Sequence, residues 1–205
     1  EKKDNKYFKK NDPISKVIVG PSESMSKSKK NVIDPENIIS NYGADAVRLF
    51  ILSDSPPEKD VQWSDQGMVA SYKFIQKLWL LHNKIKEKIN SHFSNSENFE
   101  LDKFTNQMIV KMTNNLENFN YNVIVANMHE TYNFLIKKIE NNIDSIKLLK
   151  NYKIILTMFN PVIPHFTSEC LSDFGQKNLS WPTVDESLVN DERINYVIQI
   201  NGKKR

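Results

Sequence analysis

Cysteine, glycine and long apolar runs are scarce in this chain of 205 residues. Its single cysteine, Cys170, cannot form a disulfide within the chain, and no spacing of cysteine and histidine resembles a zinc site. No stretch approaches the roughly 18 apolar residues of a membrane span, and residues 1–4 lack the apolar core of a secretion signal. These features predict a soluble, cytoplasmic protein in a reducing compartment, with no metal site formed by its own side chains.

Positive charge is concentrated at the start of the chain. The formal net charge is +3, from 28 Lys and Arg against 25 Asp and Glu. Residues 1–30 hold nine Lys and four acidic residues (+5), which leaves nineteen basic and twenty-one acidic residues (−2) elsewhere. This asymmetry favours an anionic partner at the N-terminal end, and it argues against the uniformly basic surface of a non-specific nucleic-acid-binding protein.

A run of lysines and serines, Met25-Ser26-Lys27-Ser28-Lys29-Lys30-Asn31, is the strongest functional signal in the sequence. It precedes a helix start at Asp34-Pro35-Glu36, where Asp is a good N-cap and Pro fits the first helical position. Ammonium groups and the unpaired N–H groups of a helix start both suit phosphate oxygens. The pattern indicates a polyphosphate ligand, although an ordinary solvated basic loop is the common alternative for a short lysine run.

The apolar pattern predicts a mainly α-helical protein with a short strand before the lysine loop. Residues 16–20 predict that strand. Apolar positions at three- and four-residue spacing predict helices at residues 34–42, 44–53, 64–90, 102–119, 122–141 and 145–160, with a last short helix closed near Gly175. The four longest, joined by short connections, are expected to form an antiparallel bundle.

Both ends of the chain predict incomplete sheets. Residues 196–200 have a strand pattern and Asn201-Gly202 is a strong hairpin signal, but the pattern shows no partner strand after it. Since one strand cannot form a sheet, we expect the chain to begin inside one domain and to end inside a further small one. The predicted domains are residues 1–57, 58–176 and 177–205.

Several motifs occur in an order that identifies a family. They are the Met-Ser-Lys-Ser loop at 25–28, Asp34-Pro35-Glu36, the Tyr-Gly-Ala-Asp segment at 42–50, Trp63-Ser64-Asp65, Trp79, residues 119–122, the Asn-Pro-Val-Ile-Pro-His segment at 160–165, Trp181-Pro182 and residues 197–203. Together they resemble the bacterial-type leucyl-tRNA synthetase, a class I aminoacyl-tRNA synthetase, over nearly the whole chain. The loop alone is also shared by the synthetases for isoleucine, valine and methionine, whereas residues 29–31 and 201–203 favour leucine.

The resemblance implies the activity and the domains. Residues 1–57 would end the catalytic domain, residues 58–176 would be the anticodon-binding, tRNA-binding bundle, and residues 177–205 would be a linker and the start of a C-terminal domain. The implied reaction is ATP-dependent activation of leucine to leucyl-adenylate and its transfer to tRNA(Leu), with Mg²⁺ accompanying ATP, in a monomer.

The resemblance also implies site residues in the loop. Lys27 is the implied catalytic residue, and the implied ATP contacts are Ser24, Met25, Ser26, Lys27, Ser28 and Lys29. Negative charge grows on pyrophosphate as the amino-acid carboxylate attacks the α-phosphorus, so a cation there stabilises the transition state more than bound ATP. The family pattern begins with a lysine where this chain has Ser24, and we expect Lys29 or Lys30 to take part of the phosphate contact.

Other charged and aromatic residues are weaker candidates. Paired lysines predict tRNA phosphate contacts at Lys137, Lys138, Lys203 and Lys204. Asp45 and Arg48 are spaced for a helical ion pair. His165 is expected to serve a helix start, and Trp63 and Trp79 are expected to pack rather than to stack on bases.

Two alternatives remain open. One is another synthetase of the same class, valyl or isoleucyl. The other is a non-catalytic helical RNA-binding or scaffold protein whose lysine loop only holds phosphate. The sequence contains no His-x-Gly-His segment, no full nucleotide-binding sheet and no editing domain, so this chain alone is expected not to activate leucine, and the leucine pocket is expected to lie outside it.

Overall fold

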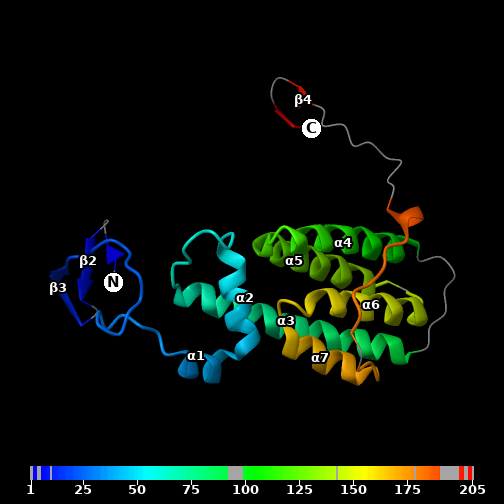
Figure 1. Cartoon of the computed structure of the whole chain (residues 1–205), viewed down its shortest axis with the longest axis horizontal. Helices are drawn as coiled ribbons and strands as arrows, with labels where there is room; N and C mark the ends of the chain where they lie inside the picture. Colours follow the sequence, from blue (N-terminus) through cyan, green and yellow to red (C-terminus); the bar gives the residue numbers. More distant parts are fainter. Residues whose placement is uncertain are drawn as a thin grey trace. The chain divides into compact units, whose positions relative to one another are not determined.

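The computed structural model describes residues 2–3, 6–9, 11–91, 99–141, 143–177, 179–189, 199–200 and 203–204 (Figure 1). Contacts divide the chain into two compact units, Glu1–Asn37 and Ile38–Arg205. The domain boundaries expected after residues 57 and 176 concern the domains of a longer enzyme and stay predictions.

The first unit contains a small antiparallel sheet, β1-β2-β3, made of β1 (Lys2–Lys3), β2 (Lys6–Lys9) and β3 (Asp12–Val17). The strand predicted at residues 16–20 is wrong in its bounds, because pairing with β2 ends at the Tyr7↔Val17 pair and Ile18 lies 97% exposed in the following loop. The strands β1 and β2 escaped prediction because lysine-rich segments show no alternation of apolar and polar residues.

Seven helices follow within the described residues: α1 (Pro35–Tyr42), α2 (Ala44–Asp54), α3 (Asp65–Asn90), α4 (Phe99–Glu117), α5 (Tyr121–Ile139), α6 (Ser145–Phe159) and α7 (Pro164–Asp173). Most begin and end within two or three residues of the prediction. The predicted cap of α3 is confirmed, since Ser64 Oγ accepts a hydrogen bond from the N–H of Gly67 at 3.1 Å. The helix α4 begins three residues earlier than predicted, because Leu101 in its first turn is buried.

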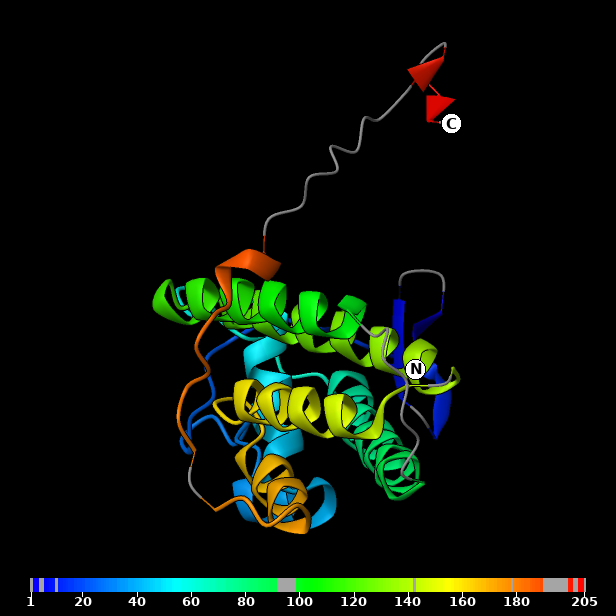
Figure 2. The same cartoon turned by 90° about the vertical axis from the view of Figure 1, so that its right-hand side faces the viewer.

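Helices α3 to α6 form the predicted bundle, and successive helices reverse direction (Figures 1 and 2). Their apolar faces share one core, whose fully buried side chains include Ile85, Met108, Met128, Leu148 and Ile155. The helices α2 and α7 pack against this bundle. Within the described ranges, none of the helices is apolar over a length that would cross a bilayer.

The C-terminal end forms a two-stranded antiparallel pair, β4 (Gln199–Ile200) and β5 (Lys203–Lys204). The expectation that this strand lacks a partner is therefore wrong, and β5 was missed because two lysines carry no strand pattern. Residues 196–198 and the predicted turn at 201–202 lie outside the described residues. Before this pair, a short helical turn, η1 (Glu186–Leu188), lies against α4, where the N–H of Asp185 donates to Asn106 Oδ1 at 2.8 Å.

Candidate phosphate-binding loop and the helical bundle

The lysine loop contains a tight turn. The N–H of Lys29 donates to Ser26 O and the N–H of Lys30 donates to Lys27 O, each at 3.2 Å. Lys30 has a φ of 53°, a left-handed conformation that reverses the chain after the turn. The four residues from Lys27 to Lys30 therefore form a projection with ammonium groups at three positions.

Asn31 closes the base of this loop. Its Oδ1 accepts from the N–H of Ser26 at 2.8 Å, and its Nδ2 donates to Ser24 O at 3.4 Å. Sequence reasoning gave Asn31 no role. The signal was present, because an asparagine side chain both donates and accepts and so can bind two points of one backbone.

The three lysines of the loop differ in their partners. Lys29 Nζ lies 2.8 Å from Glu23 Oε2, with both side chains about half exposed (48% and 54%). Lys27 and Lys30 are exposed and have no ion pair with any residue that the structure describes. Of the predicted ATP contacts, Lys27 is thus the cation most available to a ligand, whereas Lys29 is partly compensated.

The start of α1 is already capped. Asp34 Oδ1 accepts from the N–H of Glu36 at 3.1 Å, and Asp34 Oδ2 accepts from Asn37 Nδ2 at 2.7 Å. Asp34 thus pairs with one backbone N–H of this helix start, and the expectation that the remaining N–H groups meet phosphate stays a prediction. The candidate anion site consists of the ammonium and hydroxyl groups of the loop itself, which suit phosphate oxygens but include no set of oxygen ligands for a metal ion.

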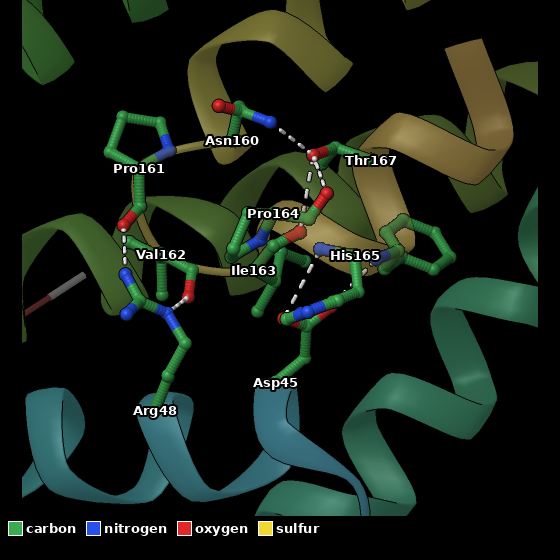
Figure 3. A network of polar contacts seen from close by, with 10 residues as sticks. Asp45, Arg48, Asn160, Pro161, Val162, Ile163, Pro164, His165 and Thr167 are labelled. Carbon is green, nitrogen blue, oxygen red and sulfur yellow. Dashed lines mark hydrogen bonds and ion pairs between the residues drawn. The ribbon is translucent and has the colours of Figure 1, made fainter. Parts of the chain in front are cut away.

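Asp45 and Arg48 do not pair with each other as predicted (Figure 3). Asp45 is 7% exposed and accepts from the N–H of Phe166 at 2.6 Å and from His165 Nδ1 at 2.9 Å. Arg48 donates instead to two carbonyls, Val162 O at 2.9 Å and Pro161 O at 2.8 Å. Their spacing allows a helical ion pair, but unpaired groups at the turn between α6 and α7 offer each a better partner.

The helix-start role of His165 is confirmed. Pro164 occupies the first position of α7 and the N–H of His165 donates to Asp45 Oδ1 at 3.3 Å. Asn160 Nδ2 and Thr167 Oγ1, 2.9 Å apart, add a second connection across the same turn (Figure 3). This turn therefore fixes α2 and α7 to the end of α6.

The packing roles of the two tryptophans are also confirmed. Trp63 meets Phe50 edge to face at 5.2 Å between ring centroids, and its Nε1 donates to Asp65 Oδ1 at 2.8 Å. Trp79 meets Phe166 edge to face at 4.9 Å. Both rings are partly buried against the core of the bundle.

The structure does not bring the four predicted tRNA lysines together. Lys138 forms an ion pair with Glu100 and lies 5.5 Å from the centre of the Phe134 ring, so its charge is largely compensated within the bundle. Lys137 is exposed. Lys203 and Lys204 form β5, and their side chains lie outside the described residues.

A chain of polar contacts, with the buried His82 of α3 at its centre, connects α6 to α7. His82 is fully buried, with Nδ1 at 3.2 Å from Tyr152 Oη and Nε2 at 3.0 Å from Asp173 Oδ2, which also accepts from Lys86 Nζ at 2.6 Å. Burial lowers the pKa of His82 more than Asp173 raises it. The hydrogen bonds from His82 and Lys86 lower the pKa of Asp173. His82 is therefore neutral. Its Nε2–H donates a hydrogen bond to the Asp173 carboxylate, and its Nδ1 accepts a hydrogen bond from the Tyr152 hydroxyl.

Comparison with known proteins identifies the family. Residues 98–205, more than half of the chain, match the family described as "Anticodon-binding domain of tRNA ligase". This chain belongs to the tRNA ligase family. Residues 14–64, which include the lysine loop, match the class I tRNA synthetases for I, L, M and V.

Two relatives of this chain are leucine–tRNA ligases. A leucine–tRNA ligase of Bartonella henselae is 38% identical over 204 residues, covering 93% of this chain and 23% of the relative. One of Wolbachia pipientis wMel is 39% identical over 196 residues, with the same coverage. The chain thus spans about a quarter of the length of these relatives. They confirm the resemblance to leucyl enzymes and favour it over the valyl, isoleucyl and non-catalytic alternatives.

A solved structure agrees with this fold. The crystal structure of the ternary complex of Agrobacterium radiobacter K84 agnB2 LeuRS-tRNA-LeuAMS matches with a TM-score of 0.74 and 27% identity, over 88% of this chain and 24% of that chain. The match confirms the mainly helical fold with an anticodon-binding bundle.

Proposed function

We propose that this chain acts within a longer leucine–tRNA ligase, which activates leucine with ATP to leucyl-adenylate and transfers it to tRNA(Leu). The observation that carries the proposal is the exposed ammonium of Lys27, which has no ion pair among the described residues, on a loop closed by Asn31. Ser24, Met25, Ser26, Ser28 and Lys29 are the further proposed ATP contacts. Cytoplasmic location and a monomeric state stay predictions.

Lys27 is proposed to act on the leaving group. As the leucine carboxylate attacks the α-phosphorus, the bond to pyrophosphate breaks and negative charge develops on the departing oxygens. An ammonium that meets those oxygens lowers the barrier by more than it stabilises bound ATP. Mg²⁺ is proposed to enter with ATP, because the donor groups of the loop suit phosphate oxygens and not a metal ion.

The bundle is proposed to bind the tRNA. The ternary complex that resembles this chain contains LeuRS with tRNA, and the family described for residues 98–205 is an anticodon-binding domain. Electrostatic contacts with the RNA backbone predict that binding weakens as salt rises.

Pyrophosphate exchange tests the proposal in the full-length protein that contains this chain. Leucine should drive exchange, and valine and isoleucine should not. Lys27→Ala should lower the leucine-dependent rate about a hundredfold, because a transition-state contact of about 3 kcal/mol is lost. Lys16→Ala is the matched control, since Lys16 is an exposed lysine of β3 outside the loop. Exchange driven by another amino acid, or equal rates for Lys27→Ala and the control, would overturn the proposal.

A further inference from the structure

Lysines follow one side of α3. Lys73, Lys77 and Lys84 are exposed and separated by four and seven residues, a spacing that places them on one face of an α-helix. Half-buried Lys88 continues the row by one turn. At 1.5 Å per residue, the row from Lys73 to Lys88 is about 22 Å long.

This side of α3 borders α5. Phe74, next to Lys73, stacks on His129 of α5 with ring centroids 3.8 Å apart. Partial burial, and after it the positive charge of Lys77, lowers the pKa of His129. Lys73, Lys77, Lys84 and His129 therefore form one surface, which we name the α3–α5 face.

Charge on this face is not compensated, unlike the charge of other lysines in the bundle. Lys86 pairs with Asp173 at 2.6 Å, Lys111 with Glu130 at 3.0 Å, and Lys138 with Glu100. In contrast, Lys73, Lys77 and Lys84 have no ion pair with any side chain in the described part of the protein. After Asp65 in its first turn, α3 contains a single acidic residue, Glu87.

We propose that the α3–α5 face binds the phosphate backbone of a folded RNA. This inference rests on the proposed function and specifies which surface of the bundle meets tRNA. A row of point charges along one face of a helix suits the repeated phosphates of an RNA backbone and positions RNA without reading its sequence. Leu80, 64% exposed, is the one large apolar side chain among the exposed positions of α3, so this side of α3 is too polar for an apolar protein interface.

The test removes the positive charge of the lysine row on α3 and measures how the affinity for tRNA depends on salt. The substitutions Lys73→Gln, Lys77→Gln and Lys84→Gln are combined in the 205-residue chain, since Gln keeps most of the side-chain length and the helix propensity. Affinity for tRNA(Leu) is measured between about 50 and about 200 mM salt. Each lost phosphate contact should reduce the slope of log K against log salt by about 1, so the triple variant should lose about 3 from the slope and about tenfold or more in affinity.

A matched control separates this face from net charge. Lys59→Gln, Lys150→Gln and Lys177→Gln remove the same charge from exposed positions outside α3 and α5 and should keep a nearly wild-type slope. Circular dichroism checks that both variants remain helical.

Three results would overturn the inference. They are a triple variant with wild-type slope and affinity, an equal loss in the control, and a wild-type chain that binds vesicles of anionic lipid but not tRNA. None of them bears on Lys27, because pyrophosphate exchange is measured without RNA.

Discussion

Asp34 and Asp45 both accept an N–H at the start of a helix, but in opposite surroundings. Asp34 is exposed and accepts from Glu36, two residues further along its own segment. Asp45 is buried and accepts from Phe166, which is 121 residues away. The first aspartate organises a local start of α1, and the second connects distant helices of the fold.

The same contrast between local and long-range contacts separates the lysine loop from the α2–α7 junction, by which we mean the contacts of Asp45 and Arg48 with residues 161–166. In the loop, the hydrogen bonds made by Asn31 reach only to Ser24 and Ser26. In the junction, Asp45 and Arg48 reach residues 113 to 121 positions away. The loop is therefore able to rearrange around a ligand at little cost to the fold, whereas the junction belongs to the cooperative core.

The largest effect on stability is expected from Asp45→Ala. It leaves the buried N–H of Phe166 without a partner, so the free energy of unfolding should fall by about 3 kcal/mol. Asp34→Ala is the matched control. It should lower the free energy of unfolding by about 1 kcal/mol or less, because water can bind the exposed N–H of Glu36 in place of the aspartate. Urea unfolding followed by circular dichroism measures both, and equal losses would contradict the distinction between the two regions.

A smaller effect, with a pH signature, is expected from His82→Gln. The pKa of His82 is lowered on folding, so the unfolded chain takes up the proton first and stability falls as pH drops below the ordinary value of 6.5. The variant should lose about 2 kcal/mol at neutral pH through its weaker buried contacts. It should also lose less stability than the wild type between about pH 7.5 and about pH 5. Parallel stability curves over that range would show that His82 does not carry the pH dependence.

The smallest effect on stability is expected from Asn31→Ala. Its contacts lie within one exposed loop, so unfolding should change by less than about 0.5 kcal/mol. Adenylate formation in the full-length enzyme should nevertheless fall about tenfold, because Lys27 is held less well in position. Asn37→Ala, which removes one exposed hydrogen bond to Asp34, serves as control and should keep the rate. A large loss of stability in Asn31→Ala, with an unchanged rate of adenylate formation, would contradict the view that Asn31 positions Lys27 and contributes little to the fold.

Local patterns predicted most of the helical fold. The apolar stripes of α3 to α6 and the cap at Ser64 depend on residues close together in the sequence, and both are confirmed. The strands β1, β2 and β5 were missed because they are short and rich in lysine, so backbone pairing and not apolar alternation defines them.

Contacts between distant residues were outside the reach of sequence reasoning. Asp45 and Arg48 have the spacing of an ion pair, and only the folded chain shows that the turn after α6 supplies their partners. In the loop, the lysines were found from the sequence, but the closing role of Asn31 and the pairing of Lys29 with Glu23 depend on how the backbone turns.

Single-turnover kinetics of Lys27→Met in the full-length protein test the central claim most directly. Met keeps most of the length of the side chain and removes its charge. Leucyl-adenylate formation should slow about a hundredfold while ATP affinity changes by less than about threefold, because the ammonium acts on charge that develops in the transition state. An unchanged rate of adenylate formation, or a loss confined to ATP affinity, would contradict the role given to Lys27.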